Sequence, residues 1–209
     1  MGVRADFRFP YYHMKLLAVS ILRYTEGALP EPVMLVQATR LLDFGFFQRG
    51  SVKEMITFFS KTIAKRAPVG RQSVQNEEYY VHVYMRADGL CGTVTCDSEY
   101  PPRVAFALLT KILEDFDARF PQWRNERRSE AIVWPELEGT LEKYQNPAEA
   151  DQIMRIQKNL DETRDVLHNT IENVLKRGEK LEDLVERSGE LSAQSKLFYK
   201  QAKRANSCC

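Results

Sequence analysis

A heptad repeat in the C-terminal part of the chain constrains the fold more than any other feature of the sequence. The repeat runs from Ile153 to Ala205 in steps of alternately three and four residues, and its register never slips. The seam positions are Ile153, Ile156, Leu160, Thr163, Leu167, Thr170, Val174, Arg177, Leu181, Leu184, Ser188, Leu191, Ser195, Phe198, Ala202 and Ala205. Such spacing keeps one stripe of a helix facing its partners, so it predicts a coiled coil. One helix of this length would reach roughly 80 Å, and it therefore has to pair with other helices or fold back along its own domain.

The seam carries one charged side chain, Arg177, in its middle. A homodimer would place two copies of Arg177 face to face, and like charges repel strongly in an apolar layer. The seam therefore favours a bundle with other chains, which supply hydrogen-bond acceptors to the guanidinium. The alternative is an ordinary two-stranded coil from which Arg177 extends into water. Gly178 and Gly189 each weaken an isolated helix by about 1 kcal/mol relative to Ala, so we expect the free segment to be poorly ordered unless it is docked.

Length and composition set broad limits on the class of protein. With 209 residues and a formal net charge of +1, the chain fits one domain plus an extended element and predicts no bulk attraction to nucleic acid. No run of 18 apolar residues occurs, and the N-terminus lacks the apolar core of a signal peptide. We expect a cytosolic protein, or one held at a membrane by other means. Residues 1–13, which precede a second methionine at Met14, are expected to be an appended arm or to mark an alternative start.

The region between Met14 and Gln145 has the pattern of an α+β domain. Alternating or strand-length apolar runs predict strands at 14–22, 33–41, 72–76, 79–86 and 90–96, the last two joined by a two-residue Asp88-Gly89 turn. Helices are predicted at 51–65 with Ser51 as the cap, after Pro101 and Pro102, and around Leu137 and Leu141. This order predicts an antiparallel sheet of about five strands with helices on both faces. A short hinge at 146–150 separates the domain from the heptad segment.

Two adjacent phenylalanines of the first predicted helix point in different directions. Phe59 belongs to the apolar stripe that should cover the sheet, whereas Phe58 projects about 100° away from it. Phe58 is therefore either a docking point for a peptide or helix beside a groove, or a side chain packed under a neighbouring loop.

Residue patterns for catalysis or metal binding are absent from the sequence. There is no Gly-rich phosphate loop, no paired metal-ligand spacing and no G-x-S-x-G nucleophile motif. His82 has no carboxylate or second ligand near it in sequence, and we interpret it as structural. Cys91 and Cys96 should be buried free thiols on opposite faces of one strand. We therefore expect a protein that is not an enzyme and that has no metal or cofactor.

Several stretches resemble the lipid-anchored longin R-SNAREs, the YKT-type synaptobrevin homologues. They are FGFFQRGSV, EYPPRVAFALL, KYQNPAEAD, QKNLDETRDVLHNTIENVLKRGEKLEDLVERS and the ending NSCC. The resemblance implies a profilin-like longin domain at 14–145, the hinge at 146–150, an R-SNARE motif at 151–205 and a lipidated tail at 206–209. It makes Arg177 the ionic-layer residue, which meets three glutamines from Qa-, Qb- and Qc-SNARE helices. It also implies a closed form in which the motif wraps onto a groove containing Phe58 and Phe59.

The resemblance also implies a lipid anchor and a place in the cell. Palmitoyl on Cys208 and prenyl on Cys209 would be covalent lipids rather than cofactors. The family's CCaaX ending is incomplete here, which implies either processing or another prenylation route. The implied function is vesicle fusion in ER, Golgi, endosomal and vacuolar transport, on the cytosolic face of these membranes. Two alternatives remain: an adaptor module of trafficking, and cysteine-based acyl transfer.

Overall fold

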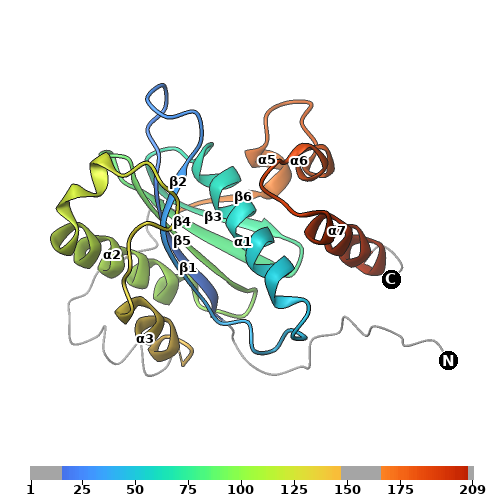
Figure 1. Cartoon of the computed structure of the whole chain (residues 1–209), viewed down its shortest axis with the longest axis horizontal. Coiled ribbons are helices and arrows are strands. Elements are labelled where there is room, and N and C mark those ends of the chain that lie inside the picture. Colours follow the sequence, from blue (N-terminus) through green and yellow to red (C-terminus); the bar gives the residue numbers. More distant parts are fainter. Residues whose placement is uncertain (1–15, 147–165, 207–209) are drawn as a thin grey trace.

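The sheet begins with the predicted N-terminal hairpin. The computed structural model describes residues 16–146 and 166–206 of the chain (Figure 1). Strands β1 (Leu16–Arg23) and β2 (Val33–Thr39) pair antiparallel, with Val19 opposite Ala38. The turn-rich break between them has Gly27 at a φ of 78°, a left-handed conformation that favours glycine. The predicted hairpin is confirmed.

Six strands make up the sheet in the described part of the chain. The remaining strands are β3 (Gly70–Asn76), β4 (Tyr79–Met85), β5 (Leu90–Asp97) and β6 (Val166–Thr170), in the order β2-β1-β5-β4-β3-β6. The first five pair antiparallel as predicted, whereas β6 lies parallel to β3. The five strands predicted within residues 14–145 are confirmed, and a sixth strand that was not predicted joins them. The sixth strand comes from the heptad segment, because β3 is an edge strand whose unpaired backbone groups accept a partner.

Helices cover both faces of the sheet (Figure 1). They are α1 (Arg49–Ala64) on one face, and α2 (Pro102–Arg119), the short 3-10 helix η1 (Pro121–Asn125) and α3 (Glu136–Lys143) on the other. The helix predicted after Pro101 and Pro102 is confirmed, as is the short helix with buried Leu137 and Leu141. Ser51 is not the cap of α1. A turn from Gly45 to Gln48 leads directly into α1, so Ser51 is buried inside the helix.

Three sequence predictions concern residues of β4 and β5. Cys91 and Cys96 are both free and buried, and they belong to apolar clusters on opposite faces of the sheet. His82 is buried with its Nδ1 2.8 Å from the Ser73 hydroxyl, and its burial, followed by the charge of His168, lowers its pKa to about 4. These predictions are confirmed. The turn is one residue longer than predicted, because Arg86 and Leu90 still pair and Gly89 supplies a φ of 87°.

Candidate functional site

The C-terminal segment, residues 166–206, lies docked on the domain that precedes it. After β6 it forms the short helix α5 (Ile171–Val174), then α6 (Leu181–Arg187) and α7 (Ala193–Asn206), drawn in orange to red in Figure 1. The heptad repeat predicted one continuous helix, but in this structure the described part of the segment is a strand followed by three helices. The heptad pattern alone therefore does not determine the backbone of the docked segment.

An apolar cluster joins the docked segment to α1 and the sheet. From the segment it contains the buried residues Ile171, Leu175, Leu181, Val185 and Leu191. From α1 it contains Met55, Phe58 and Ile63. Phe58 is only 9% exposed, so it is part of the surface that the segment covers. Phe59 is partly buried against the same cluster, with its ring centroid 5.7 Å from that of Phe58.

The predicted seam positions have different environments in the docked segment. Leu181, Leu191 and Ser195 are buried, Val174, Leu184, Ser188, Phe198 and Ala202 are partly buried, and Leu167, Thr170, Arg177 and Ala205 are exposed. Ile153, Ile156, Leu160 and Thr163 lie outside the described residues, as do Cys208 and Cys209. The docked segment thus does not bury its seam as one stripe.

Sequence reasoning missed three of the buried aliphatic residues of the docked segment. Ile171, Leu175 and Val185 each come directly after a seam position, so they lie beside the seam rather than on it. The signal was present in the sequence, because large aliphatic side chains next to a complete seam need a second surface to cover them.

Polar contacts fix the segment along α1 and the turn that follows it. Arg66 pairs with Glu179 at 3.0 Å and Lys61 with Glu190 at 2.7 Å. The Ser192 N–H donates to a Glu54 carboxylate oxygen at 2.9 Å. Burial raises the pKa of Glu54, but the hydrogen bonds from the Ser192 backbone and from the hydroxyls of Ser195 and Ser192 bring it below its usual value. The docked form therefore holds Glu54 ionised.

Helix α7 is also tied to α6. Lys200 pairs with Glu186, and Lys203 pairs with Glu182. The Lys196 ammonium donates to the Glu186 carbonyl at 2.8 Å. Three of the basic side chains of α7 therefore face α6 in the docked form.

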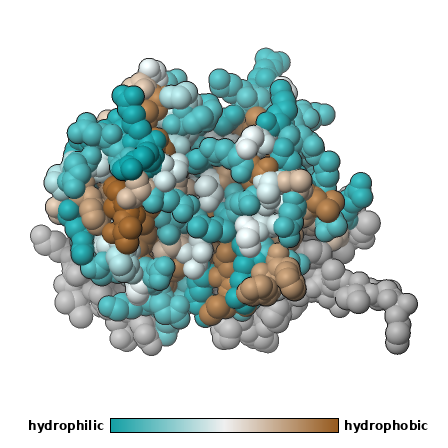
Figure 2. Space-filling model, in the orientation of Figure 1, coloured by the Kyte–Doolittle hydropathy of each residue, from teal (hydrophilic) through white to brown (hydrophobic). Residues whose placement is uncertain are grey.

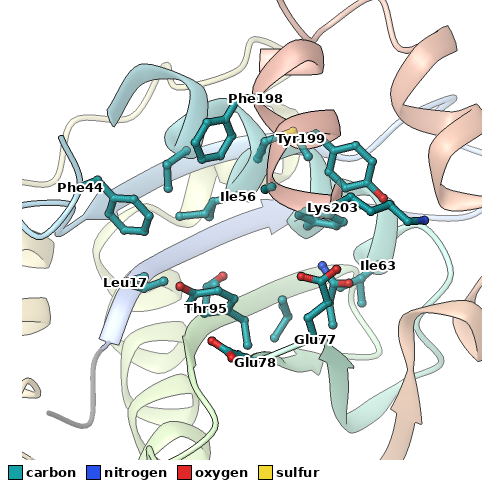
Figure 3. A pocket seen from close by; sticks show the side chains of 17 residues that line it. Leu17, Phe44, Ile56, Ile63, Glu77, Glu78, Thr95, Phe198, Tyr199 and Lys203 are labelled. Atoms are coloured by element: carbon teal, nitrogen blue, oxygen red, sulfur yellow. The ribbon is translucent and has the colours of Figure 1, made fainter. Parts of the chain in front are cut away.

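An apolar cavity of about 170 Å³ lies between α7, α1 and the sheet. Figure 3 shows Phe198 and Tyr199 reaching into it from α7, Ile56 from α1 and Leu17 from β1. Glu77 of the turn between β3 and β4 borders it. Burial, with the charges of Glu77 and Glu172, raises the pKa of Tyr199 to about 12. The cavity is mainly a hydrophobic space with its polar groups at the rim.

Two family models match consecutive parts of the chain. Residues 41–141 match the Longin model, described as a regulated-SNARE-like domain, and residues 152–208 match the Synaptobrevin model. The synaptobrevin homologue ykt6 of Schizosaccharomyces pombe is 53% identical over 198 residues, 94% of this chain and 98% of the relative. The chain belongs to the Ykt6 family of synaptobrevin-like SNARE proteins.

Other members of the family show similar coverage. The VAMP-like protein YKT61 of Arabidopsis thaliana is 48% identical over 94% of this chain and 98% of its own. The synaptobrevin homologue YKT6 of Saccharomyces cerevisiae is 48% identical over 84% of this chain and 90% of its own. These relatives are named as synaptobrevin homologues or VAMP-like proteins and not as enzymes. None of the helices in the described ranges has the length and apolar character needed to cross a membrane.

The apolar cluster predicts that Phe58→Glu will release the docked segment. A carboxylate placed in this cluster has no partner there, and burying it costs several kcal/mol. We expect the bonds within 166–206 to become much more sensitive to protease, as measured by limited proteolysis with mass spectrometry.

The matched control is Val69→Glu, at a side chain that is 67% exposed just beyond α1. Circular dichroism should show that both variants keep a folded domain. Equal protection of the segment in the two variants would show that Phe58 does not hold it.

Proposed function

We propose that this protein is an R-SNARE that assembles with Qa-, Qb- and Qc-SNARE helices into a four-helix bundle and thereby drives intracellular vesicle fusion. The described structure corresponds to its closed form. The observation that carries the proposal is that one segment has both a heptad seam centred on Arg177 and a docking face that shares only part of that seam. Such a segment has two folded states that compete, which a switch requires.

The proposed ionic layer lies at a point where the docked backbone is not helical. Arg177 is exposed between α5 and α6, and the next residue, Gly178, has a φ of 87°. This left-handed conformation costs a residue with a Cβ roughly 1–2 kcal/mol. In a continuous helix, by contrast, glycine is about 1 kcal/mol worse than alanine. Gly178 thus suits the closed form and is a weak point of the assembled one.

The proposed membrane anchor is a prenyl group on Cys209 and a reversible palmitoyl group on Cys208. One lipid chain alone gives marginal, reversible binding, whereas a second chain or a basic segment makes it stable. Lys196, Lys200 and Arg204 lie in α7, just before this tail. Palmitoylation would therefore switch the protein between cytosol and the membranes of Golgi, endosomes, vacuole and vesicles.

A cytosolic form of a prenylated protein has to shield its lipid from water. The apolar cavity supports this form, because Ala202 and Lys203 of α7 line it and the cysteines follow a few residues later. Release of α7 would open the cavity and free the seam in the same step. Closure and anchoring would then exclude each other.

Arg177→Ala should weaken the four-helix complex. The exchange removes a buried guanidinium and leaves its acceptors unpaired, a loss of about 2–3 kcal/mol for hydrogen bonds to a charged group. The measurement is thermal melting of the complex purified with Qa, Qb and Qc helices. Lys176→Ala, the exposed neighbour off the seam, is the control and should have little effect. Equally small effects would contradict the ionic-layer role.

Gly178→Ala should accelerate assembly with the Q-SNARE helices. The new Cβ meets no atom within 4 Å, so the effect is one of backbone conformation alone. Strain in the closed form and better helix propensity in the open form together shift the balance by about 2 kcal/mol.

The control is Gly189→Ala, which also has open space for a Cβ but no positive φ, and so gains only in helix propensity. Stopped-flow assembly of the two variants with the same Q-SNARE helices measures the difference. Equal acceleration by both variants would show that the turn at Gly178 does not limit opening.

The anchor predicts a specific mass for the C-terminal peptide from cells. Mass spectrometry should find a prenyl group on Cys209 and a partial palmitoyl group on Cys208. Cys208→Ser should remove the palmitoyl mass, keep the prenyl mass and shift the protein towards the cytosolic fraction. A peptide without any lipid would refute the anchor but leave the SNARE assembly assignment intact.

A further inference from the structure

The loop between β2 and α1 exposes an unusual group of large apolar side chains. Phe46 is 75% exposed, Phe47 is 84% exposed and Leu42 is 64% exposed. The rings of Phe46 and Phe47 pack edge to face, with centroids 5.5 Å apart. Figure 2 shows hydrophobic surface gathered at the end of α1 where this loop lies. Scattered exposed apolar residues are normal in proteins, but a paired group of this size marks an interaction site.

The loop is built so that this aromatic pair stays outside. Phe44 is buried in a cluster with Leu17 and Val52 and fixes the loop from below. The Arg49 guanidinium donates to the carbonyls of Phe44 and Leu42 at 3.1 and 3.2 Å. Backbone turns close at Phe44 and again at Gln48. Because the loop is held by these bonds, the exposure of Phe46 and Phe47 is a property of the fold.

Helix α7 continues the exposed surface. The Gln194 side chain donates to the Phe47 carbonyl at 3.4 Å, which places the first turn of α7 beside the loop. Leu197, three residues further on and thus on the same side of the helix, is 55% exposed. Helix α7 has four basic residues and no acidic one. Three of these basic side chains face α6, so the positive charge beside the loop comes from Arg49, whose guanidinium binds the carbonyls of Phe44 and Leu42. The loop and the first turns of α7 therefore present exposed apolar side chains next to this charge.

We propose that Phe46, Phe47, Leu42 and Leu197 insert into the headgroup region of an anionic lipid bilayer. Phenylalanine and leucine beside basic residues are typical of surfaces that lie in the membrane interface. Phe46 and Phe47 do not line the apolar cavity, so they project as a tip and do not form a groove for a helix or peptide. The surface also shares α7 with the chain that leads to Cys208. The bilayer is thus the occupant that fits the shape, the charge and the position.

This contact requires neither a covalent lipid nor a partner helix. It would give the protein a weak, reversible first contact with a membrane before its tail engages. The inference therefore goes beyond the proposed fusion activity. It is tested on the unlipidated full-length chain alone, so its failure would leave the assembly experiments unaffected.

The first experiment places a fluorescent reporter in the loop. Trp123 and Trp134 are buried, so their emission should not respond to vesicles. In the Phe47→Trp variant, vesicles of phosphatidylcholine and phosphatidylserine should shift the emission to the blue, and brominated lipids should quench it. Unchanged emission in the presence of these vesicles would overturn the proposal.

The second experiment compares matched variants by vesicle sedimentation. Phe46→Ser combined with Phe47→Ser should lower the partition coefficient on these vesicles by about tenfold or more, because two large apolar side chains no longer leave water. The control combines Val69→Ser with Val133→Ser, at two exposed valines outside this loop, and should bind like the parent chain.

Three results would overturn the proposal. One is equal binding by the loop variant and the control, and another is binding that does not need phosphatidylserine. The third is self-association of the parent chain without vesicles that the loop substitutions abolish, because the surface would then bind a second copy of the chain. Loss of binding in the loop variant alone, with a monomeric parent chain, would support it.

Discussion

The docked arrangement of the C-terminal segment depends on the apolar cluster around Phe58. This cluster joins α1 and the sheet to the C-terminal segment, and Phe58 lies more than 100 residues before Ile171 and Val185 in the sequence. Without the segment, α1 would expose Phe58 to water. Without α1, the segment would have no surface for its off-seam aliphatics. Each part therefore stabilises the conformation of the other.

The residues used for docking and those of the seam overlap only in part. Ile171 and Val185 are buried although they lie off the seam, and Leu167 and Arg177 are exposed although they lie on it. Leu181 and Leu191 belong to both sets. Under the proposed function, helical partners would find part of the seam accessible in the closed form, but they could complete the bundle only by removing these two leucines from the cluster. The shared residues would make closing and assembly compete.

The sequence predicted most of the longin-type domain because its signals are local. Alternation along β4, the apolar face of α1 and the prolines before α2 each act over a few residues. Strand β6 could not be predicted in this way, because its partner residues in β3 lie 95 positions earlier in the sequence and the pairing is parallel. Residues Val166–Thr170 also belong to the heptad repeat, so their local pattern predicts a helix. They form a strand because the edge of β3 pairs with them.

Sequence reasoning also missed three buried aliphatic residues because it used only the local heptad pattern. A heptad assignment counts the residues that fit the seam and ignores those beside it, although Ile171, Leu175 and Val185 would be costly to leave in water. A segment with a complete seam and additional aliphatics has more apolar surface than one bundle can bury. This excess of apolar surface was the sequence signal that the segment also docks on another surface.

The free-energy contributions of the individual contacts show which of them hold the segment in its docked position. The pairs Arg66–Glu179 and Lys61–Glu190 are each partly open to solvent, and such pairs contribute about 0–1 kcal/mol. Burying one large aliphatic or aromatic side chain contributes about 1.5–3 kcal/mol. The cluster therefore dominates, and the ion pairs mainly set the position of the segment along α1. Ordering the segment has an opposing entropic cost of similar size. Under the proposed function, the balance between the docked and the assembled state would therefore be close enough for partners or lipids to change it.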